Sequence, residues 1–383
     1  MKIPYSIRIA VLATMLTASA SLRAEDAPLE SVLPDPEERA AVEKVLAYHG
    51  VEPEINAGGR QPTVSLYNEA DRNSIRFVID GESQRITSIR SNRSGLHNEH
   101  FVWFQPLDEL EALFMDHTFD NKRTEEIEFD GSGLDALAGL EKLTFLRFPG
   151  GAFADPGAEA VARMPRIEEL IVFHTEISNA GLGALSEHPS LRMIQLGPAW
   201  RPELVTPEGF AHLAAMPALE EINLAEIRLY WEDGLEHLAA AKDRIRKIDL
   251  KNCAVLPEDL AKLRAAMPDT EIEYIGFEEF IRQYDDGSLK FGGKLKREVD
   301  PAYIEKIRAA AEGTAPAEPE VTLEPEPAEE RTWTNPEGET FEGVYVSSED
   351  ETVTILRAVD QREFQVPLSE LSEGDREYVA GRE

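Results

Sequence analysis

The chain has 383 residues, with 39 Lys and Arg against 73 Asp and Glu, so its formal charge at pH 7 is −34. A hydrophobic fraction of 42% is enough for a folded core and excludes a wholly disordered chain. The acidity argues against duplex nucleic acid and anionic membrane as partners, because both require a basic surface. One cysteine, Cys253, excludes an intramolecular disulfide and a cysteine-cluster metal site.

Residues 1–24 have the pattern of a secretory signal peptide. Lys2 and Arg8 charge its start, and Ile9–Leu22 supplies an apolar run that is too short to span about 30 Å of hydrocarbon comfortably. Small residues place the cleavage site after either Ala20 or Ala24. The sequence therefore predicts an exported protein, secreted or periplasmic in a bacterial envelope, with no integral membrane segment after signal removal.

Residues 25–60 are predicted to form an N-terminal linker and a capping helix, because Glu37–His49 has an amphipathic pattern. A repeat begins after it. Five segments share the form L-x-x-L-x-L, and their first members are 24, 24, 28 and 26 residues apart. The apolar triplets are Leu143/Leu146/Phe148, Ile167/Leu170/Val172, Leu191/Ile194/Leu196, Leu219/Ile222/Leu224 and Ile245/Ile248/Leu250.

A second marker has a matching period, since a glycine precedes each triplet by about ten residues. An apolar residue at helical spacing follows each glycine, and each triplet ends with the period-two alternation of a strand. The glycines are Gly133, Gly157, Gly181, Gly209 and Gly234. These five copies in phase resemble the leucine-rich repeat family. The resemblance implies an α/β fold, a solenoid whose curved parallel sheet carries helices on its outer side.

The repeat domain is predicted to cover residues 61–276. Leu110, Leu113 and Met115 fit an earlier triplet, with an insertion expected around Asn121–Glu128. Ile86 and Ile89 fit a degenerate unit before it. Further along the chain, Pro257–Met267 repeats the helix and Ile272–Ile275 the final strand. Cys253 is expected to be a buried turn residue, because free cysteines tend to be buried.

The concave strand face is the candidate binding site. Residues that flank the buried triplet positions are expected to project from it in columns, and four of them, Phe145, Ile171, Phe173 and Met193, would form an exposed apolar patch typical of a protein contact. Coverage of this patch by residues 277–330 or by neighbouring segments remains an open alternative. Trp200 and Tyr230–Trp231 are expected at its rim. The candidate binding residues are Phe145, Arg147, Ile171, Phe173, Met193, Gln195, Asn223 and Asp249.

Residues 277–330 are predicted to be a linker, with one short helix at Pro301–Ala311. From residue 312 to 330 the composition is dominated by glutamate and proline and includes no basic residue. Such a segment repels itself and cannot build a core, so it marks a domain boundary.

Residues 331–383 change to short β-rich runs, followed by Ser372 and Asp375 at the start of a final helical turn. The pattern resembles the Sla-type homology domain (SHD-one), which implies an SH3-like barrel and binding of peptides such as Asn-Pro-Phe-x-Asp. In eukaryotic relatives it also implies cytoskeletal-protein, ubiquitin and identical-protein binding. Trp333 is either a core anchor or a binding aromatic. The matching residues are Arg331, Trp333, Thr334, Gly338, Phe341, Val344, Val353, Leu356, Val366, Pro367, Leu368, Leu371, Ser372, Asp375, Tyr378 and Val379.

No enzyme signature is present in the sequence. His97 and His100 are the nearest approach to a metal motif, but they are spaced i, i+3 rather than i, i+4, and no third ligand is evident. We therefore expect a non-enzymatic interaction scaffold or adaptor for a protein or peptide partner, without cofactor or metal, and with self-association as a further expectation. The alternative is an envelope hydrolase or its glycan- or substrate-binding subunit.

Overall fold

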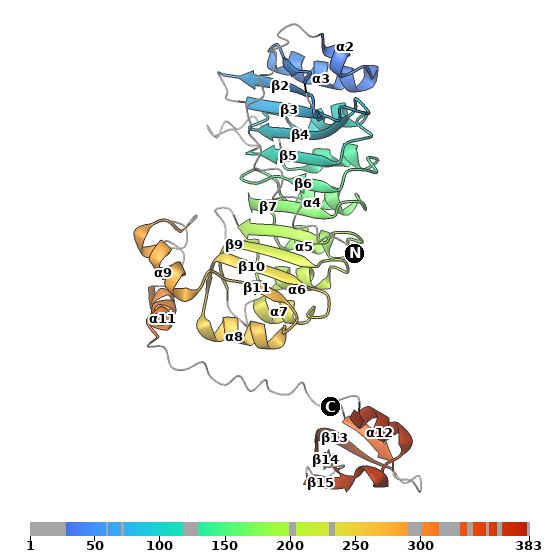
Figure 1. Ribbon diagram of the computed structural model, residues 1–383, viewed down its shortest axis with the longest axis vertical. Helices are drawn as coiled ribbons and strands as arrows, with labels where there is room; N and C mark the ends of the chain where they lie inside the picture. The colour runs from blue at the N-terminus through green and yellow to red at the C-terminus, as the bar shows by residue number, and fades with distance from the viewer. Residues whose placement is uncertain are drawn as a thin grey trace. The chain divides into compact units, whose positions relative to one another are not determined.

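The computed structural model describes residues 28–58, 60–69, 73–117, 129–198, 204–229, 234–289, 301–313, 330–334, 340–349, 352–357 and 362–380. The chain forms two compact units, one ending at Glu318 and the other beginning at Pro319 (Figure 1). The predicted signal peptide and the insertion around 121–128 lie outside the described residues. None of the helices within the described ranges has the length and apolar run needed to cross a bilayer.

One sheet organises the first unit, with eleven strands among the described residues, hydrogen-bonded in chain order. The first four strands pair antiparallel, and every pair from β4 to β11 is parallel. The strands are β1 (Glu54–Asn56), β2 (Thr63–Asn68), β3 (Asn73–Ile79), β4 (Ile86–Asn92), β5 (Ala112–Asp116), β6 (Phe145–Arg147), β7 (Glu169–Thr175), β8 (Met193–Pro198), β9 (Glu221–Leu229), β10 (Lys247–Val255) and β11 (Glu271–Glu273).

Helical segments connect the parallel strands and lie along one side of the sheet (Figure 1). Parallel strands require such crossovers, whereas only a few residues separate β2 from β3 and β3 from β4, which is enough for antiparallel pairing. The connecting segments are η1 (Asn98–Phe104), η2 (Ser132–Leu137), α4 (Asp155–Ala162), α5 (Asn179–Leu185), α6 (Pro207–Ala215), α7 (Glu236–Ala239) and α8 (Pro257–Ala266). Two further helices, α2 (Leu29–Val32) and α3 (Pro36–His49), precede β1. A large parallel sheet with helices on one face confirms the predicted α/β class and is consistent with a leucine-rich-repeat solenoid.

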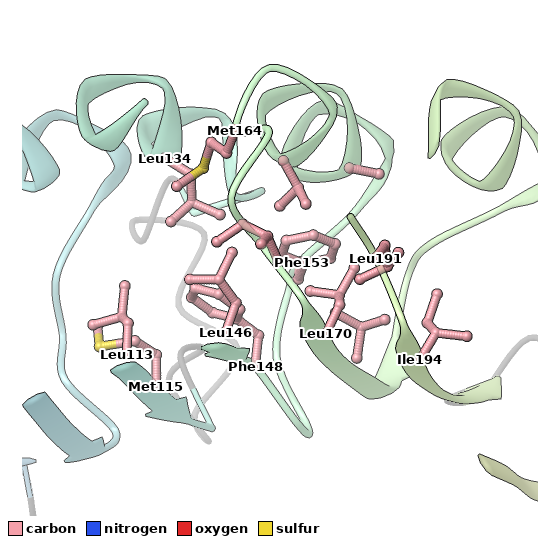
Figure 2. Packing of buried hydrophobic residues seen from close by; sticks show 14 of the residues in the cluster. Leu113, Met115, Leu134, Leu146, Phe148, Phe153, Met164, Leu170, Leu191 and Ile194 are labelled. Carbon is pink, nitrogen blue, oxygen red and sulfur yellow. The ribbon is translucent and has the colours of Figure 1, made fainter. Parts of the chain in front are cut away.

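The apolar triplets build the core between the sheet and the helices. All fifteen positions are buried, and Leu146, Leu170 and Ile194 stand in register on successive strands. Figure 2 shows this row, with Leu134 and Met164 packing above it from the helical side. Cys253 is fully buried as predicted, although it lies within β10 rather than in a turn.

The repeated glycines lie where a repeat packs closely against the previous one. A Cβ on Gly133 would lie 2.2 Å from the carbonyl oxygen of Asn98, and one on Gly181 would lie 2.5 Å from Asp155 Oδ1. The side chains of Asn98 and Asp155 also bond the next repeat, since Gly181 N donates to Asp155 Oδ1 at 3.0 Å and Gly133 N to Asn98 Oδ1 at 3.3 Å. Glycine is required here because a side chain would separate the repeats.

The predicted capping helix is α3. Asp35 caps its start by accepting from the Glu37 and Glu38 amides, and Gly50 ends it in the left-handed region. The fully buried Glu38 carboxylate accepts from the Ile86 amide at 2.9 Å and from Arg85 Nε at 2.7 Å. These bonds attach the cap to β4.

The stretch from 277 to 311, which the sequence assigns to a linker, contains α9 (Phe277–Asp286) and α11 (Pro301–Ala311). The second of these is the helix expected there. Both helices have an apolar side that joins a cluster with Ala254 of β10, and Tyr303 Oη donates to the Ala254 carbonyl at 2.9 Å. Burial of this apolar surface explains why the segment is folded onto the first unit.

Among its described residues, the second unit has a four-stranded antiparallel sheet in chain order, followed by a 3-10 helix and an α-helix. Trp333 is fully buried and donates to the Gly343 carbonyl, so it is a core anchor rather than a surface aromatic. Asp375 is buried and accepts from Arg331 Nη2 at 2.6 Å and from Thr334 N at 2.8 Å. The elements are β12 (Glu330–Thr334), β13 (Thr340–Glu349), β14 (Thr352–Arg357), β15 (Arg362–Pro367), η5 (Leu368–Glu370) and α12 (Glu373–Ala380). An SH3-like barrel stays a prediction.

Candidate binding face

The face of the sheet opposite the helices carries two rows of side chains, which follow from the strand register. We call the longer one the central row and the other the second row. The central row is Arg76, Arg90, Phe114, Arg147, Ile171, Gln195, Asn223, Asp249 and Glu273. The second row is Ala112, Phe145, Glu169, Met193, Glu221, Lys247 and Glu271.

The structure places seven of the eight candidate binding residues in these rows. Five belong to the central row and two, Phe145 and Met193, to the second row. Phe173 lies in the next column along β7, in register with Gly197. The strand register thus places these residues on one face, and binding by them stays a prediction.

The expected apolar patch is less exposed than the sequence indicated. Ile171 is 8% exposed, and Phe145, Phe173 and Met193 are half-buried. Neighbouring strands are about 4.8 Å apart, so the long side chains of Arg147 and Gln195 flank Ile171 on both sides. Polar groups thus separate these apolar side chains, so the face is a mixture of polar and apolar groups rather than a continuous apolar surface.

Charge differs along the face. At its β10–β11 end, Glu273 accepts from Lys251 Nζ at 2.7 Å and pairs with Lys247 at 3.0 Å. These hydrogen bonds to Lys251 and Lys247 lower the pKa of Glu273. In the second row, burial raises the pKa of Glu169, and the charge of Glu221 adds to the effect. The ionised form of Glu169 is therefore disfavoured.

The β1–β6 end contains a pocket of about 760 Å³ that the sequence did not identify. Arg76, Arg90 and Phe114 line it together with the predicted Arg147, whose guanidinium forms a bidentate pair with Asp116 at 2.9 and 3.0 Å. The sequence held a signal for two of the missed residues, because Arg90 and Phe114 follow the core positions Ile89 and Leu113 in the way Arg147 follows Leu146. Arg76 lies on an antiparallel strand outside the repeat, so the repeat pattern did not point to it.

The histidine pair belongs to the packing around the cap. His100 is buried, its ring stacks on Trp103 at 4.4 Å between centroids, and its Nδ1 accepts from the His97 amide at 3.0 Å. Burial lowers the pKa of His100, with a contribution from His97. Within the described ranges no group of three or more His, Cys, Asp and Glu side chains is placed to hold a metal ion. The predicted rim residues Trp200 and Tyr230–Trp231 lie outside the described residues.

Coverage by the tail was the open alternative for this face. The described part of 277–313 packs against Ala254 and Leu256, near the ends of β10 and α8, rather than on the two rows. The half-buried aromatic rings of Phe114 and Phe145 contact each other instead, with centroids 4.8 Å apart. The rows at β5–β9 are thus not covered by the described residues of that segment.

No protein-family model matches the chain, and no curated protein matches it. Among solved structures, an internalin from Listeria monocytogenes is similar to this chain at 15% sequence identity and a TM-score of 0.33. The match covers 66% of this chain and 59% of the internalin chain. A likeness this distant says nothing about what the chain binds, and the fold assignment rests on the strand order and register.

Proposed function

We propose that the chain is an exported, non-enzymatic scaffold that binds a protein partner through the central and second rows of its sheet. The observation that carries the proposal is the continuity of these rows on the side away from the helices: the central row crosses β3–β11 in register and the second row crosses β5–β11. A rigid, pre-formed surface of alternating polar and half-buried apolar side chains suits protein recognition, because little conformational entropy is lost on binding.

The proposal extends to the second unit as an SH3-like, peptide-binding module. Its support is the small antiparallel sheet around Trp333 and the SHD-one pattern of the sequence. Two binding modules on one chain gain effective concentration when a single partner presents both epitopes. Export is supported by the pattern of residues 1–24.

The test compares partner capture by the full chain and by matched variants. In the first variant, Phe145→Ser and Met193→Ser remove the apolar side chains of the second row. In the control, Glu159→Lys changes an exposed residue of α4 on the helical side. The proposal expects a partner retained by the wild type and by the control to be lost by the row variant. Equal retention by both variants would exclude the second row as the contact.

A further inference from the structure

Arg76 and Arg90 stand opposite each other on the antiparallel strands β3 and β4, inside the pocket at the β1–β6 end of the face. Like charges placed directly across two strands destabilise a sheet unless a group of opposite charge compensates them. Both residues are exposed, and neither takes part in an ion pair with any other residue that the structure describes. This uncompensated pair occurs in a chain whose formal charge is −34.

The residues next to Arg76 and Arg90 on the adjacent strands do not neutralise either positive charge. Arg76 Nε donates to the Ser65 hydroxyl at 3.2 Å, and Arg90 Cζ lies 4.5 Å from the ring centroid of Phe114. A hydroxyl and an aromatic ring orient a guanidinium but do not neutralise it. Although Arg90 is exposed overall, partial desolvation of its guanidinium lowers its pKa, and the charge of Arg76 adds to the effect. Arg147, two strands away in the same row, has a bidentate carboxylate partner in Asp116.

The rest of the pocket limits what the two arginines can hold. Tyr67 is 60% exposed and Phe114 offers a half-buried ring, so apolar groups find contacts beside the charges. Glu52 and Glu54 line the same pocket and repel a second negative charge. An extended polyanion such as a nucleic acid would also meet the acidic remainder of the protein. The pocket therefore favours one compact anion next to apolar groups.

We propose that Arg76 and Arg90 form a binding site for the carboxylate of an acidic side chain in a partner peptide, with Phe114 and Tyr67 contacting its apolar neighbours. The inference rests on the proposed function, because it names the chemistry of the partner segment at one end of the same face. Two guanidinium groups on adjacent strands present several N–H donors to one carboxylate, and such charge-assisted bonds are about twice as strong as neutral ones.

The test uses the full chain and a nine-residue peptide, blocked at both ends, with a neutral fluorophore and one Glu between two Phe residues. A matched peptide has Gln in place of Glu. We expect the Glu peptide to bind about tenfold more tightly than the Gln peptide in fluorescence anisotropy at roughly 0.15 M salt. Arg76→Gln and Arg90→Gln should each abolish this preference, and Arg90→Lys should reduce it, because lysine keeps the charge but lacks the guanidinium fork.

The control is Arg163→Gln, which removes an exposed arginine paired with Asp135 on the helical side and should leave the preference unchanged. Thermal melts of the variants check folding. Competition of wild-type binding by glutarate gives a second readout that needs no variant, and displacement of the Glu peptide is expected. Equal affinity for the two peptides, or a preference that survives both Gln variants, would overturn the proposal. Partner capture tests the second row, whereas the peptide assay tests Arg76 and Arg90. Failure of the proposed function and failure of the carboxylate site can therefore be told apart.

Discussion

Replacing Gly133 by alanine should weaken the contact between two repeats and destabilise the first unit more than the same substitution at an exposed glycine. The new Cβ would lie 2.2, 2.7 and 2.8 Å from the carbonyl oxygen, Cα and carbonyl carbon of Asn98. All three atoms are backbone, so relief requires η1 and η2 to move apart by about 1 Å, and overpacking of this kind costs about 1–3 kcal/mol. The free energy of unfolding of the first unit should fall by that amount.

The matched control is Gly139→Ala, where a Cβ would meet nothing within 4 Å. Its effect should stay within about 0.5 kcal/mol, as for most surface substitutions. Urea denaturation followed by far-ultraviolet circular dichroism gives both values, and a lower slope for the Gly133 variant would show that the repeats unfold less cooperatively. The reasoning is refuted if Gly133→Ala costs no more than its control.

Three further predictions concern single side chains. His188 is buried, its Nδ1 accepts from the Ser190 and Leu191 amides, and burial lowers its pKa. The stabilisation that neutral His188 provides is fully present above about pH 6.5 and is lost as the pH falls through the lowered pKa of the folded state. His188→Gln should therefore lower the free energy of unfolding by about 1–2 kcal/mol at pH 7.5, and by less in melts at pH 5. Glu169→Gln should stabilise the chain by about 0.5–1 kcal/mol at pH 7.5, because the pKa of Glu169 is raised and its ionised form is disfavoured; the gain should vanish below about pH 4, and a gain that grows on acidification would contradict it. Asp375→Ala should destabilise the second unit by about 2–3 kcal/mol, seen as faster hydrogen exchange in peptides from residues 362–380, while exchange in the first unit stays unchanged.

The strand positions followed from the sequence because each repeat places the same apolar triplet under the same helix. Leu146, Leu170 and Ile194 could be aligned by period alone, and their neighbours on the open face followed from the alternation of a strand. The glycine marker was visible too, but its cause was not. Only the structure shows that Gly133 and Gly181 face Asn98 and Asp155 of the preceding repeat.

The missed features are those that depend on contacts between distant segments. Arg76 and Arg90 meet because β3 and β4 pair antiparallel, and nothing in a 24-residue period specifies that pairing. The helices α9 and α11 fold onto the first unit because β10 presents Ala254 to them, which a local composition does not reveal. Ile171 is more buried than expected, and its register places it between the long side chains of Arg147 and Gln195 on neighbouring strands.

The most direct measurement is site-specific photo-crosslinking of the full chain in envelope extracts, with p-benzoylphenylalanine at a single position. At Phe173 the probe replaces a half-buried ring on the open face, and at Glu159 it lies exposed on α4. Binding through the sheet predicts a discrete protein adduct from position 173 that is absent at position 159. An adduct from position 159 alone, or equal adducts from both positions, would contradict it.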